Sequence, residues 1–486
     1  MAQKAYKRAN KKRRKKNSIT LLLLLLGLGV VVLFFTYFSY QFPSALSNAS
    51  TSKVCARVAT QTFCRGSTEN PVQKAIDYAS ANHYQEVVLD PGTFWLTEKI
   101  TINNPGPTPA ALHIPSNITL RGSQDSSNPS VLKIANTLGA IDIMVYISGS
   151  PEDPSIPVSN VNLQYIVLDG LTDSTVMPIV GIWASKTSGN VNVEHTTVKN
   201  TKSTGMILGY LAQYQQDPGT NRAVVYKFSG TSESPNRVVN NTVQKVGGDG
   251  IAVLGEYIIV TGNKISSALS TYSNCITAFT ESKNILINNN TVSNCRTGIG
   301  IDGSYPLYFS NAVDMDTFQQ SLNEAGKGNE VGFASYITIE KNIVNYSLVG
   351  IGTWRNLETV IKNNTIVGNN ASGSIGVHLN ESRNNYVVGN TIKKVKRGVV
   401  LRSVGYSAVG SSYNGIGVYK VNDQYENWGN IIETSNTGID FEGEKNFLFG
   451  NTVRANKITK ATTPCNYSAG AQTVATNNSP ESCNLQ

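Results

Sequence analysis

Apolar and polar residues alternate along most of this chain in short runs that return at intervals of 21–27 residues. One phrase reads I-L-I-N-N-N-T-V at 285–292 and V-I-K-N-N-T-I-V at 360–367. Alternation with a period of two predicts strands rather than helices. An asparagine marks the same point of each phrase, before a pair such as T-V or K-I: Asn241, Asn263, Asn290, Asn342, Asn364, Asn390, Asn430 and Asn451.

A second phrase follows each marker and begins with Gly-Ile or a close variant. Examples are T-G-I-G-I-D-G at 297–303, V-G-I-G-T-W at 349–354 and T-G-I-D-F-E-G at 437–443. We name this segment the Gly-Ile strand. Each unit therefore reads as strand, Asn turn, strand and Gly-Ile strand, with no helical pattern long enough for a βαβ crossover. Strands that recur at this period predict a solenoid whose coils bury one another's apolar residues.

The asparagine markers have a structural explanation. Asparagine tolerates left-handed backbone angles, and stacked side-chain amides can hydrogen-bond from coil to coil. At the start of the solenoid, Asn70-Pro71 predicts the beginning of a helix with Val72, Ala75, Ile76 and Ala79 on one face. Such a helix would cap the open end. The predicted fold class is all-β, a single-stranded parallel β-helix over residues 70–460 with an N-terminal cap helix.

At this point the sequence resembles the pectate-lyase-like right-handed parallel β-helix superfamily. The phrase A-I-D-Y-A-S-A-N-H-Y-Q-E-V-V-L-D-P-G-T-F-W-L-T-E-K-I-T-I (75–102) looks like its cap helix followed by its P-G-T strand. The N-T-V and Gly-Ile repeats are similar to those of carbohydrate-binding and sugar-hydrolase β-helix proteins, including NosD-like periplasmic proteins. The resemblance covers roughly 70–460 and implies the right-handed fold. The superfamily holds lyases, hydrolases, epimerases and non-enzymes, so it implies no single activity.

The N-terminus predicts a membrane segment. Residues 1–18 form a basic cytoplasmic tail with nine Lys/Arg, and residues 19–40 carry no charge. As a helix, 19–40 would span roughly 30 Å, about one bilayer core. The basic tail would stay in the cytoplasm, so the rest of a single-pass protein would be extracytoplasmic. The alternative is a signal peptide cleaved near Ser47, after which the protein would be secreted.

Charge and cysteines agree with an extracytoplasmic body. The chain has 41 Lys/Arg and 32 Asp/Glu, and without the basic tail these numbers balance, so we expect no nucleic-acid partner. The segment 41–69 is predicted to be a linker with the cysteine pair Cys55 and Cys64. The segment 461–486 is predicted to be a polar tail with its own pair, Cys465 and Cys483. These pairs, and a third of Cys275 with Cys295, predict disulfides. The sequence contains no CxxC motif and no Cys/His cluster, so we expect no zinc site.

Alternation along the Gly-Ile strand separates inward from outward side chains. Aligned on its Ile, the second following position is apolar and is predicted to point inward: Leu208, Val253, Ala278, Ile301, Thr353, Val377, Leu401 and Phe441. The third following position is predicted to form an outward row: Gly209, Leu254, Phe279, Asp302, Trp354, His378, Arg402 and Glu442. The first following position is also outward and mostly small.

This outward row is the predicted binding face. Coils stack about 4.8 Å apart, so its side chains would lie in line. Trp354 offers a flat surface on which a sugar ring stacks its C–H groups. Three insertions, at 210–236, 303–332 and 403–427, follow Gly-Ile strands and carry tyrosines. Tyr305, Tyr406 and Tyr413 are therefore predicted to join Trp354 in binding the substrate.

The candidate catalytic residues are His378, Arg402, Asp302, Asp440 and Glu442. Asp440 and Glu442 are spaced about 7 Å along one face of a strand, which suits an inverting hydrolase. Elimination from a uronate would use His378 with Arg402, or Arg402 with a Ca²⁺ ion held by Asp302. No cofactor is required, and Ca²⁺ is the one optional ion. The signature motifs of polygalacturonases, pectate lyases and alginate epimerases are missing or partial.

Three functions remain open from the sequence. The first is a polysaccharide lyase or glycoside hydrolase acting on an extended polymer, such as a uronate. The second is a non-catalytic glycan-binding or cell-envelope protein that uses the same face, with a polysaccharide or cell-surface glycan as its partner. The third is a NosD-like maturation factor for an extracytoplasmic metalloenzyme, although no Met/His/Cys cluster favours direct copper chemistry.

Overall fold

The computed structural model describes residues 54–484 except 65, 67–69, 104–106, 154, 173–176, 217–222, 269–272, 281, 303–332, 404–410, 422–423, 444–447, 449 and 468–472. The predicted tail 1–18 and the apolar segment 19–40 lie outside the described residues. Within the described residues, no helix combines the length and the apolar character needed to cross a bilayer.

Two long sheets contain almost all of the described strands. The first has 16 strands, and its order follows the sequence after an initial hairpin. Its strands are β1 (Cys55–Val58), β2 (Gln61–Cys64), β3 (Glu86–Leu89), β7 (Thr119–Arg121), β10 (Val158–Gln164), β13 (Thr187–Glu194), β18 (Asn236–Val239), β21 (Glu256–Thr261), β24 (Lys283–Asn288), β27 (Ala334–Glu340), β30 (Asn356–Leu357), β31 (Val360–Lys362), β34 (Tyr386–Val388), β36 (Gly415–Ile416), β40 (Asn451–Arg454) and β43 (Thr473–Thr476).

The second sheet has 23 strands in two parallel rows. The short row, which follows the Asn turn, contains β4 (Gly92–Leu96), β8 (Ser130–Ile134), β11 (Ile166–Asp169), β14 (Thr197–Thr201), β19 (Thr242–Val246), β22 (Lys264–Ala268), β25 (Thr291–Ser293), β28 (Ile343–Asn345), β32 (Thr365–Val367) and β41 (Lys457–Thr459). The Gly-Ile row contains β5 (Ile100–Asn103), β6 (Pro107–Ile114), β9 (Ile143–Ile147), β12 (Val180–Ala184), β15 (Met206–Leu208), β20 (Ile251–Val253), β23 (Asn274–Phe279), β26 (Thr297–Asp302), β29 (Val349–Trp354), β33 (Ile375–Asn380) and β42 (Thr463–Asn466). Strands β35 (Thr391–Ser403) and β39 (Ile431–Gly443) run through both rows.

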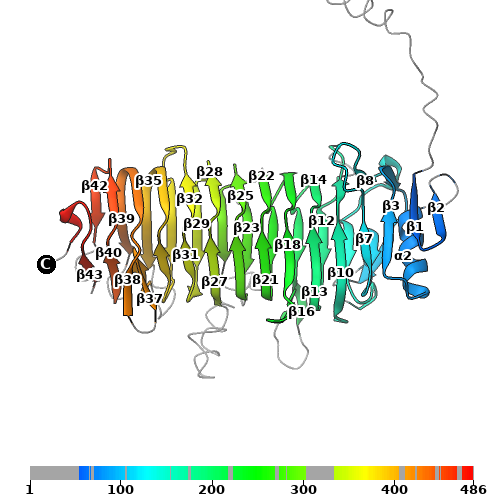
Figure 1. The fold of residues 1–486 in the computed structure, drawn as a ribbon, viewed down its shortest axis with the longest axis horizontal. Coiled ribbons are helices and arrows are strands. Elements are labelled where there is room, and N and C mark those ends of the chain that lie inside the picture. Colours follow the sequence, from blue (N-terminus) through cyan, green and yellow to red (C-terminus); the bar gives the residue numbers. More distant parts are fainter. Residues whose placement is uncertain are drawn as a thin grey trace, which may run out of the picture. The chain divides into compact units, whose positions relative to one another are not determined.

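Each coil passes from the first sheet to the short row and then to the Gly-Ile row. Figure 1 shows the strands following one another in sequence order from β3 to β43. Pairing between coils is parallel from β7 onwards, for example β24 with β27 and β26 with β29. One continuous apolar core fills the interior, rich in Ile, Val and Leu. The predicted parallel β-helix is therefore confirmed.

Asparagine amides connect the coils at the turn before the short row. Asn290 is representative: its Oδ1 accepts from both the backbone N and Nδ2 of Asn263 at 2.9 Å. Its Nδ2 donates to Val260 O at 2.9 Å and to Oδ1 of Asn342 at 3.0 Å. The same ladder joins Asn241, Asn263, Asn290, Asn342, Asn364, Asn390, Asn430, Asn456, Asn478 and Asn484.

This turn uses two consecutive residues, the first for the left-handed backbone bend and the second for the amide ladder. From Asn241 to Asn478, the residue before each ladder asparagine takes the left-handed conformation, as at Asn240, Asn289 and Asn363 with φ near 55°. The prediction that one asparagine does both was wrong on this point. The last predicted marker, Asn451, was also misassigned. It belongs to a second ladder, of Asn356, Asn385, Asn414 and Asn451, at the turn that enters the first sheet.

The N-terminal end is capped as predicted. Helix α2 (Pro71–Ala81) begins after Asn70, whose side chain accepts from Gln73 N, and buries Val72, Ala75, Ile76 and Ala79. Ahead of it, β1 and β2 form a hairpin closed by the Cys55–Cys64 disulfide, and β1 pairs with β3. Strand pairing thus starts before the predicted boundary at residue 70.

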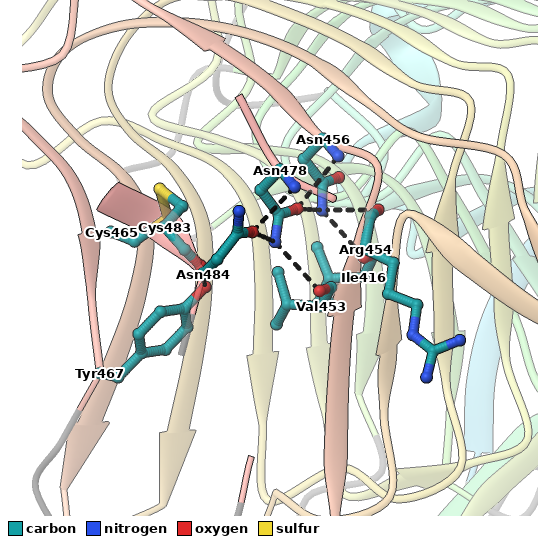
Figure 2. The surroundings of a disulfide bond; sticks show 9 residues. All are labelled: Ile416, Val453, Arg454, Asn456, Cys465, Tyr467, Asn478, Cys483 and Asn484. Carbon is teal, nitrogen blue, oxygen red and sulfur yellow. Dashed lines mark hydrogen bonds between the residues drawn. A yellow bond between two sulfur atoms is a disulfide. The ribbon is translucent and has the colours of Figure 1, made fainter. Parts of the chain in front are cut away.

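The C-terminal end closes the ladder. Asn484 accepts from Asn478, which in turn accepts from Asn456, so the tail supplies the last rungs (Figure 2). The Cys465–Cys483 disulfide fixes the residue next to Asn484, and the hydroxyl of Tyr467 donates to Cys483 O at 2.9 Å. Burial raises the pKa of Tyr467 and keeps it a neutral donor. The third predicted disulfide, Cys275–Cys295, joins adjacent coils.

Replacing a rung in the middle of the ladder should destabilise the fold. In Asn290→Ala, Val260 O and the amide groups of Asn263 lose their partners while they remain buried, at a cost of about 2 kcal/mol or more. Urea unfolding of the variant measures this loss. The matched control is Asn427→Ala in the exposed strand β38 (Gln424–Asn427), which should stay within about 0.5 kcal/mol of the parent. Equal midpoints for the two variants would contradict a stabilising ladder.

Candidate functional site

Along each strand of the Gly-Ile row, side chains point alternately into the core and outward, as the sequence pattern predicted. The predicted inward residues are buried, including Leu208, Val253, Ile301, Leu401 and Phe441 at 0–1% exposed. The residues between them point outward and form rows along the stacked strands. We call this outward surface the Gly-Ile face.

One residue of the predicted outward row was misplaced. Strand pairing sets Asp302 beside Trp354, Trp354 beside Asn380, Asn380 beside Arg402, and Arg402 beside Glu442. The row therefore contains Asn380 in the coil where His378 was expected. The error was a shift of two residues in one coil, which keeps the same side of the strand outward.

His378 lies in the adjoining outward row. Pairing places it next to Gly352 on one side and Val400 on the other, with Asp440 one coil beyond Val400. His378 and Asn380 thus project from the same side of β33, two residues apart. His378 and Trp354 belong to neighbouring coils, so the two rows form one surface.

Trp354 stands on an open part of this surface. Its side chain is 40% exposed. Gly300 and Gly352 lie next to each other in the adjoining row, and neither has a side chain to cover the strands. A Cβ atom at position 352 would meet only side-chain methyls of Val349 and Thr297, at 3.3 and 3.5 Å. Gly352 therefore leaves a low floor beside an exposed indole, whereas the side-chain amide of Asn274 covers Gly300.

Two buried polar atoms beside this floor have no protein partner. Neither Nε2 of His378 nor Oδ1 of Asn380 has a hydrogen bond to any described residue. Buried polar atoms without partners are rare in folded proteins. Arg402 is exposed in the next coil and forms no ion pair with the described residues. Arg402 can therefore contact a bound molecule directly, whereas Nε2 of His378 and Oδ1 of Asn380 are covered by their neighbours.

The predicted carboxylate pair is bridged by an arginine that sequence reasoning missed. Nη1 of Arg397 lies 3.5 Å from Oδ2 of Asp440 and also contacts Oε1 of Glu442. Asp440 is 5% exposed and accepts from Nδ2 of Asn466 at 2.8 Å. In an inverting hydrolase the space between the two carboxylates holds water and substrate. Here the guanidinium contacts both carboxylates, which counts against that assignment.

The surroundings of His378 keep it neutral. Burial lowers its pKa to about 4, and the charges of Arg397 and Arg402 act in the same direction. At neutral pH the imidazole carries no charge and can donate or accept a hydrogen bond. A general base works best with a pKa near the operating pH, so His378 is a weak base in the unliganded protein.

A second acidic group lies on the same side, earlier along the chain. Asp249 precedes β20 and accepts from Asn274 N at 2.7 Å and from Oγ1 of Thr277 at 2.9 Å. Burial raises its pKa against the effect of these hydrogen bonds, and the charge of Asp302 raises it further. Asp249 therefore holds the start of β23 in the next coil by two hydrogen bonds, and its pKa also responds to the charge of Asp302.

Two of the predicted tyrosines, Tyr305 and Tyr406, lie outside the described residues. The third, Tyr413, does not join Trp354. It stands at the turn before β36, on the outer side of the first sheet. There it lines a groove of about 530 Å³ together with four further tyrosines, Tyr336, Tyr386, Tyr419 and Tyr425. We call this the tyrosine groove.

The tyrosine groove and the Gly-Ile face meet around one corner of the coil. Glu358 lines the groove only four residues after Trp354. Part of the groove is built by the insertion 403–427, which forms a hairpin of β37 (Val418–Val421) and β38. The insertion 210–236 forms another, of β16 (Tyr210–Gln216) and β17 (Ala223–Tyr226). Figure 1 shows β37, β38 and β16 along the same edge of the coils, as the sequence predicted.

The described histidines do not form a metal centre. His113 contacts Ser148, His195 stacks on Tyr165, and His378 lies near two arginines. Among the residues with described positions, no three His, Cys, Asp or Glu side chains gather as ligands. A cation beside His378 would be repelled by Arg397 and Arg402, so these residues do not fit a copper ion. The optional Ca²⁺ at Asp302 stays a prediction.

The stacked parallel strands, the ladders and the cap helix define a parallel β-helix protein. Three disulfides are typical of an extracytoplasmic compartment. The family model described as periplasmic copper-binding protein (NosD) matches residues 267–408, a stretch that includes Trp354, His378 and Arg402. No curated protein matches the chain in sequence.

Several solved structures are similar over most of the chain. The Dettilon tailspike protein is 17% identical, with 85% of this chain and 66% of the tailspike covered and a TM-score of 0.46. This chain therefore spans just under two thirds of that tailspike. The A-module of Azotobacter vinelandii mannuronan C-5 epimerase AlgE4 is 14% identical, with 84% and 96% covered and a TM-score of 0.45. The Streptococcus pneumoniae surface protein and adhesin PfbA is 11% identical, with 84% and 93% covered and a TM-score of 0.44.

The low pKa of His378 predicts a particular loss of stability in acid. Between pH 6.5 and about 4 the imidazole of His378 is protonated in the unfolded chain but neutral in the folded protein. The free energy of unfolding therefore falls as the pH drops through this window. His378→Gln removes the effect. From pH 7.5 to pH 4.5 the parent should lose about 2–3 kcal/mol more than the variant. Urea unfolding at both pH values measures the difference, and NMR should show His378 titrating near pH 4. A midpoint near 6.5 would contradict the proposed environment.

Proposed function

We propose that this chain is an extracytoplasmic polysaccharide-binding β-helix protein that holds an extended glycan along the Gly-Ile face, and that residues 19–40 anchor it to the membrane. The observation that carries the proposal is the grouping of an exposed indole with unpartnered polar atoms. Trp354 adjoins Asn380 in the next coil, and His378 projects beside Asn380 from the same strand. An exposed aromatic surface beside polar side chains suits a sugar, which has apolar ring faces and polar edges.

The shape of the face supports an extended ligand. Gly300 and Gly352 lie in neighbouring coils, and Arg402 stands two coils beyond Trp354. With coils about 4.8 Å apart, the distance from Gly300 to Arg402 is about 14 Å along the axis. A glycan on this face would stack on Trp354 and accept hydrogen bonds from the exposed guanidinium of Arg402.

Binding is favoured over catalysis by two details. The Asp440 and Glu442 pair is occupied by Arg397, and neutral His378 is a weak base. Both details weaken the inverting-hydrolase and lyase assignments that the sequence left open. The other contacts proposed for the Gly-Ile face, ring stacking and hydrogen bonding, serve to bind a glycan without cleaving it.

The binding proposal predicts that Trp354→Ala weakens glycan affinity about tenfold, because loss of one stacked ring costs about 1–1.5 kcal/mol. A glycan array probed with the full chain identifies the ligand, and calorimetry with the best glycan compares the variants. The control is Tyr84→Ala, which removes an exposed ring near the N-terminal cap and should leave affinity unchanged. If Trp354→Ala binds every array glycan as tightly as the parent, the Gly-Ile face is not the site.

Hydrolysis is the second candidate, supported by Asp249 and Asp302. A buried carboxyl group with a raised pKa near a second carboxylate resembles the acid and base of a glycosidase. If the protein cleaves its glycan, new reducing ends should appear on incubation, and Asp249→Asn should lower their rate at least 100-fold while binding persists. Unsaturated products absorbing in the ultraviolet would instead indicate elimination. Binding with no product after long incubation would leave the protein non-catalytic.

A further inference from the structure

The tyrosine groove lies on a surface that the Gly-Ile face does not include. Its floor is the outer side of the first sheet, where pairing sets Thr338 beside Val360 and Val360 beside Tyr386. Tyr336 lies near the start of β27 and Tyr413 at the turn that enters β36, three coil steps apart, which is about 14 Å. Both side chains are exposed, by 56% and 46%. The groove of about 530 Å³ has the size of a small-ligand site.

Glycines in the following coils make room for two of the rings. A Cβ atom at position 450 would lie 2.6 Å from Cδ1 of Tyr413, and one at position 415 would lie 2.8 Å from Cδ1 of Tyr386. Any side chain at these two positions would therefore displace a ring. Arg383 also lies 5.3 Å from the centre of the Tyr413 ring, a cation–π contact that helps to fix it. The two rings thus fit against glycine backbone of the next coil, and Arg383 helps to fix one of them.

The hairpin of β37 and β38 forms the other wall. Tyr419 packs edge-on against Tyr386, with ring centres 5.0 Å apart, and against Trp428 at 6.0 Å. The guanidinium of Arg454 lies 5.7 Å from the ring centre of Tyr425. The hairpin is therefore attached to the sheet by aromatic contacts, and its tyrosines face those of the sheet.

Charged residues are few in the lining of the groove. Among the described residues that line it, Lys420 is basic and Glu358 is acidic, while Asn384 and Thr338 add neutral hydrogen-bonding groups. The guanidinium groups of Arg383 and Arg454 lie against the rings of Tyr413 and Tyr425. Tyrosine supplies both an apolar ring face and a hydroxyl, and five tyrosines in one groove suit a ligand with alternating apolar and hydroxylated surfaces. Those are the properties of an uncharged sugar chain.

We infer that the tyrosine groove is a second carbohydrate site, which binds a neutral oligosaccharide running across the coils from β27 to β36. The inference does not depend on Trp354, because the two surfaces use different residues. A proline-rich peptide also docks on aromatic-lined grooves and is the principal competing occupant.

The test uses the full chain and a panel of uncharged oligosaccharides on an array, with uronate oligosaccharides and proline-rich peptides as the other probes. Affinity for the best uncharged glycan is then measured by calorimetry. The double variant Tyr336→Ala with Tyr413→Ala should bind it at least tenfold more weakly. Tyr257→Ala is the matched control, because Tyr257 is exposed, has the same left-handed backbone (φ 53°) and lies at the start of β21, outside the groove. It should stay within twofold of the parent.

The outcomes separate this site from the Gly-Ile face. Loss of uncharged-glycan binding in the double variant, with Trp354→Ala within twofold of the parent, supports the second site whatever happens at the first. Unchanged affinity in the double variant overturns it, as does an array on which no uncharged glycan binds. Peptide binding that the double variant abolishes, without any glycan binding, would assign the groove to a peptide and also overturn it. Thermal unfolding of each variant confirms that the coils remain intact.

Discussion

Register between successive coils is the constraint on which the rest of this structure depends. A parallel β-helix has no local signal that keeps one coil from sliding past the next, since every Gly-Ile strand resembles every other. The asparagine ladder supplies that signal, because each amide binds a fixed backbone carbonyl as well as the next amide. A slip of one residue would leave these buried groups unpartnered throughout the stack. The rows of outward side chains are a consequence of this fixed register.

Fixed register also explains where the chain tolerates insertions. The coils are held by the two sheets and the two ladders, so an added segment at the corner after the Gly-Ile strand leaves the stack intact. The insertion 403–427 uses this freedom to place Tyr419 and Tyr425 over residues of the first sheet. Functional surface is therefore added at a corner whose length is not set by the core. The core itself stays uniform, and its apolar side chains take no part in the proposed binding.

Much of the fold could be predicted because repeated alternation and paired cysteines leave few arrangements. The inward residues, the cap helix and the three disulfides followed from local pattern alone. The row of His378 could not be predicted in this way. Ile375 and Val377 are both apolar and lie on the same side of the strand, so either one can align with Ile351, and only the paired strands distinguish them. Similarly, Asn451 and Asn456 each fit a ladder, and the sequence does not say which.

The tyrosine groove was missed for a different reason. Tyr336 and Tyr386 come from strands of the first sheet, while Tyr419 and Tyr425 come from an insertion, so nothing in the sequence joins them. Tyr413 was found, but it was assigned to the wrong face. The assignment assumed that residues of an insertion lie over the strand that precedes them. In fact the chain turns the corner first, and Tyr413 stands at the entrance to the next strand, β36.

The charges on the two surfaces limit how a single ligand can use both. Asp249 and Asp302 place negative charge towards the N-terminal side of Trp354, whereas Arg402 lies on its C-terminal side. A polymer charged at every sugar would be attracted at one end of the Gly-Ile face and repelled at the other. A neutral or sparsely charged chain meets no such conflict, and Glu358 of the groove lies four residues after Trp354 along the chain. The electrostatics of the face and the tyrosine lining of the groove therefore favour the same class of ligand, although the two sites are built from different residues.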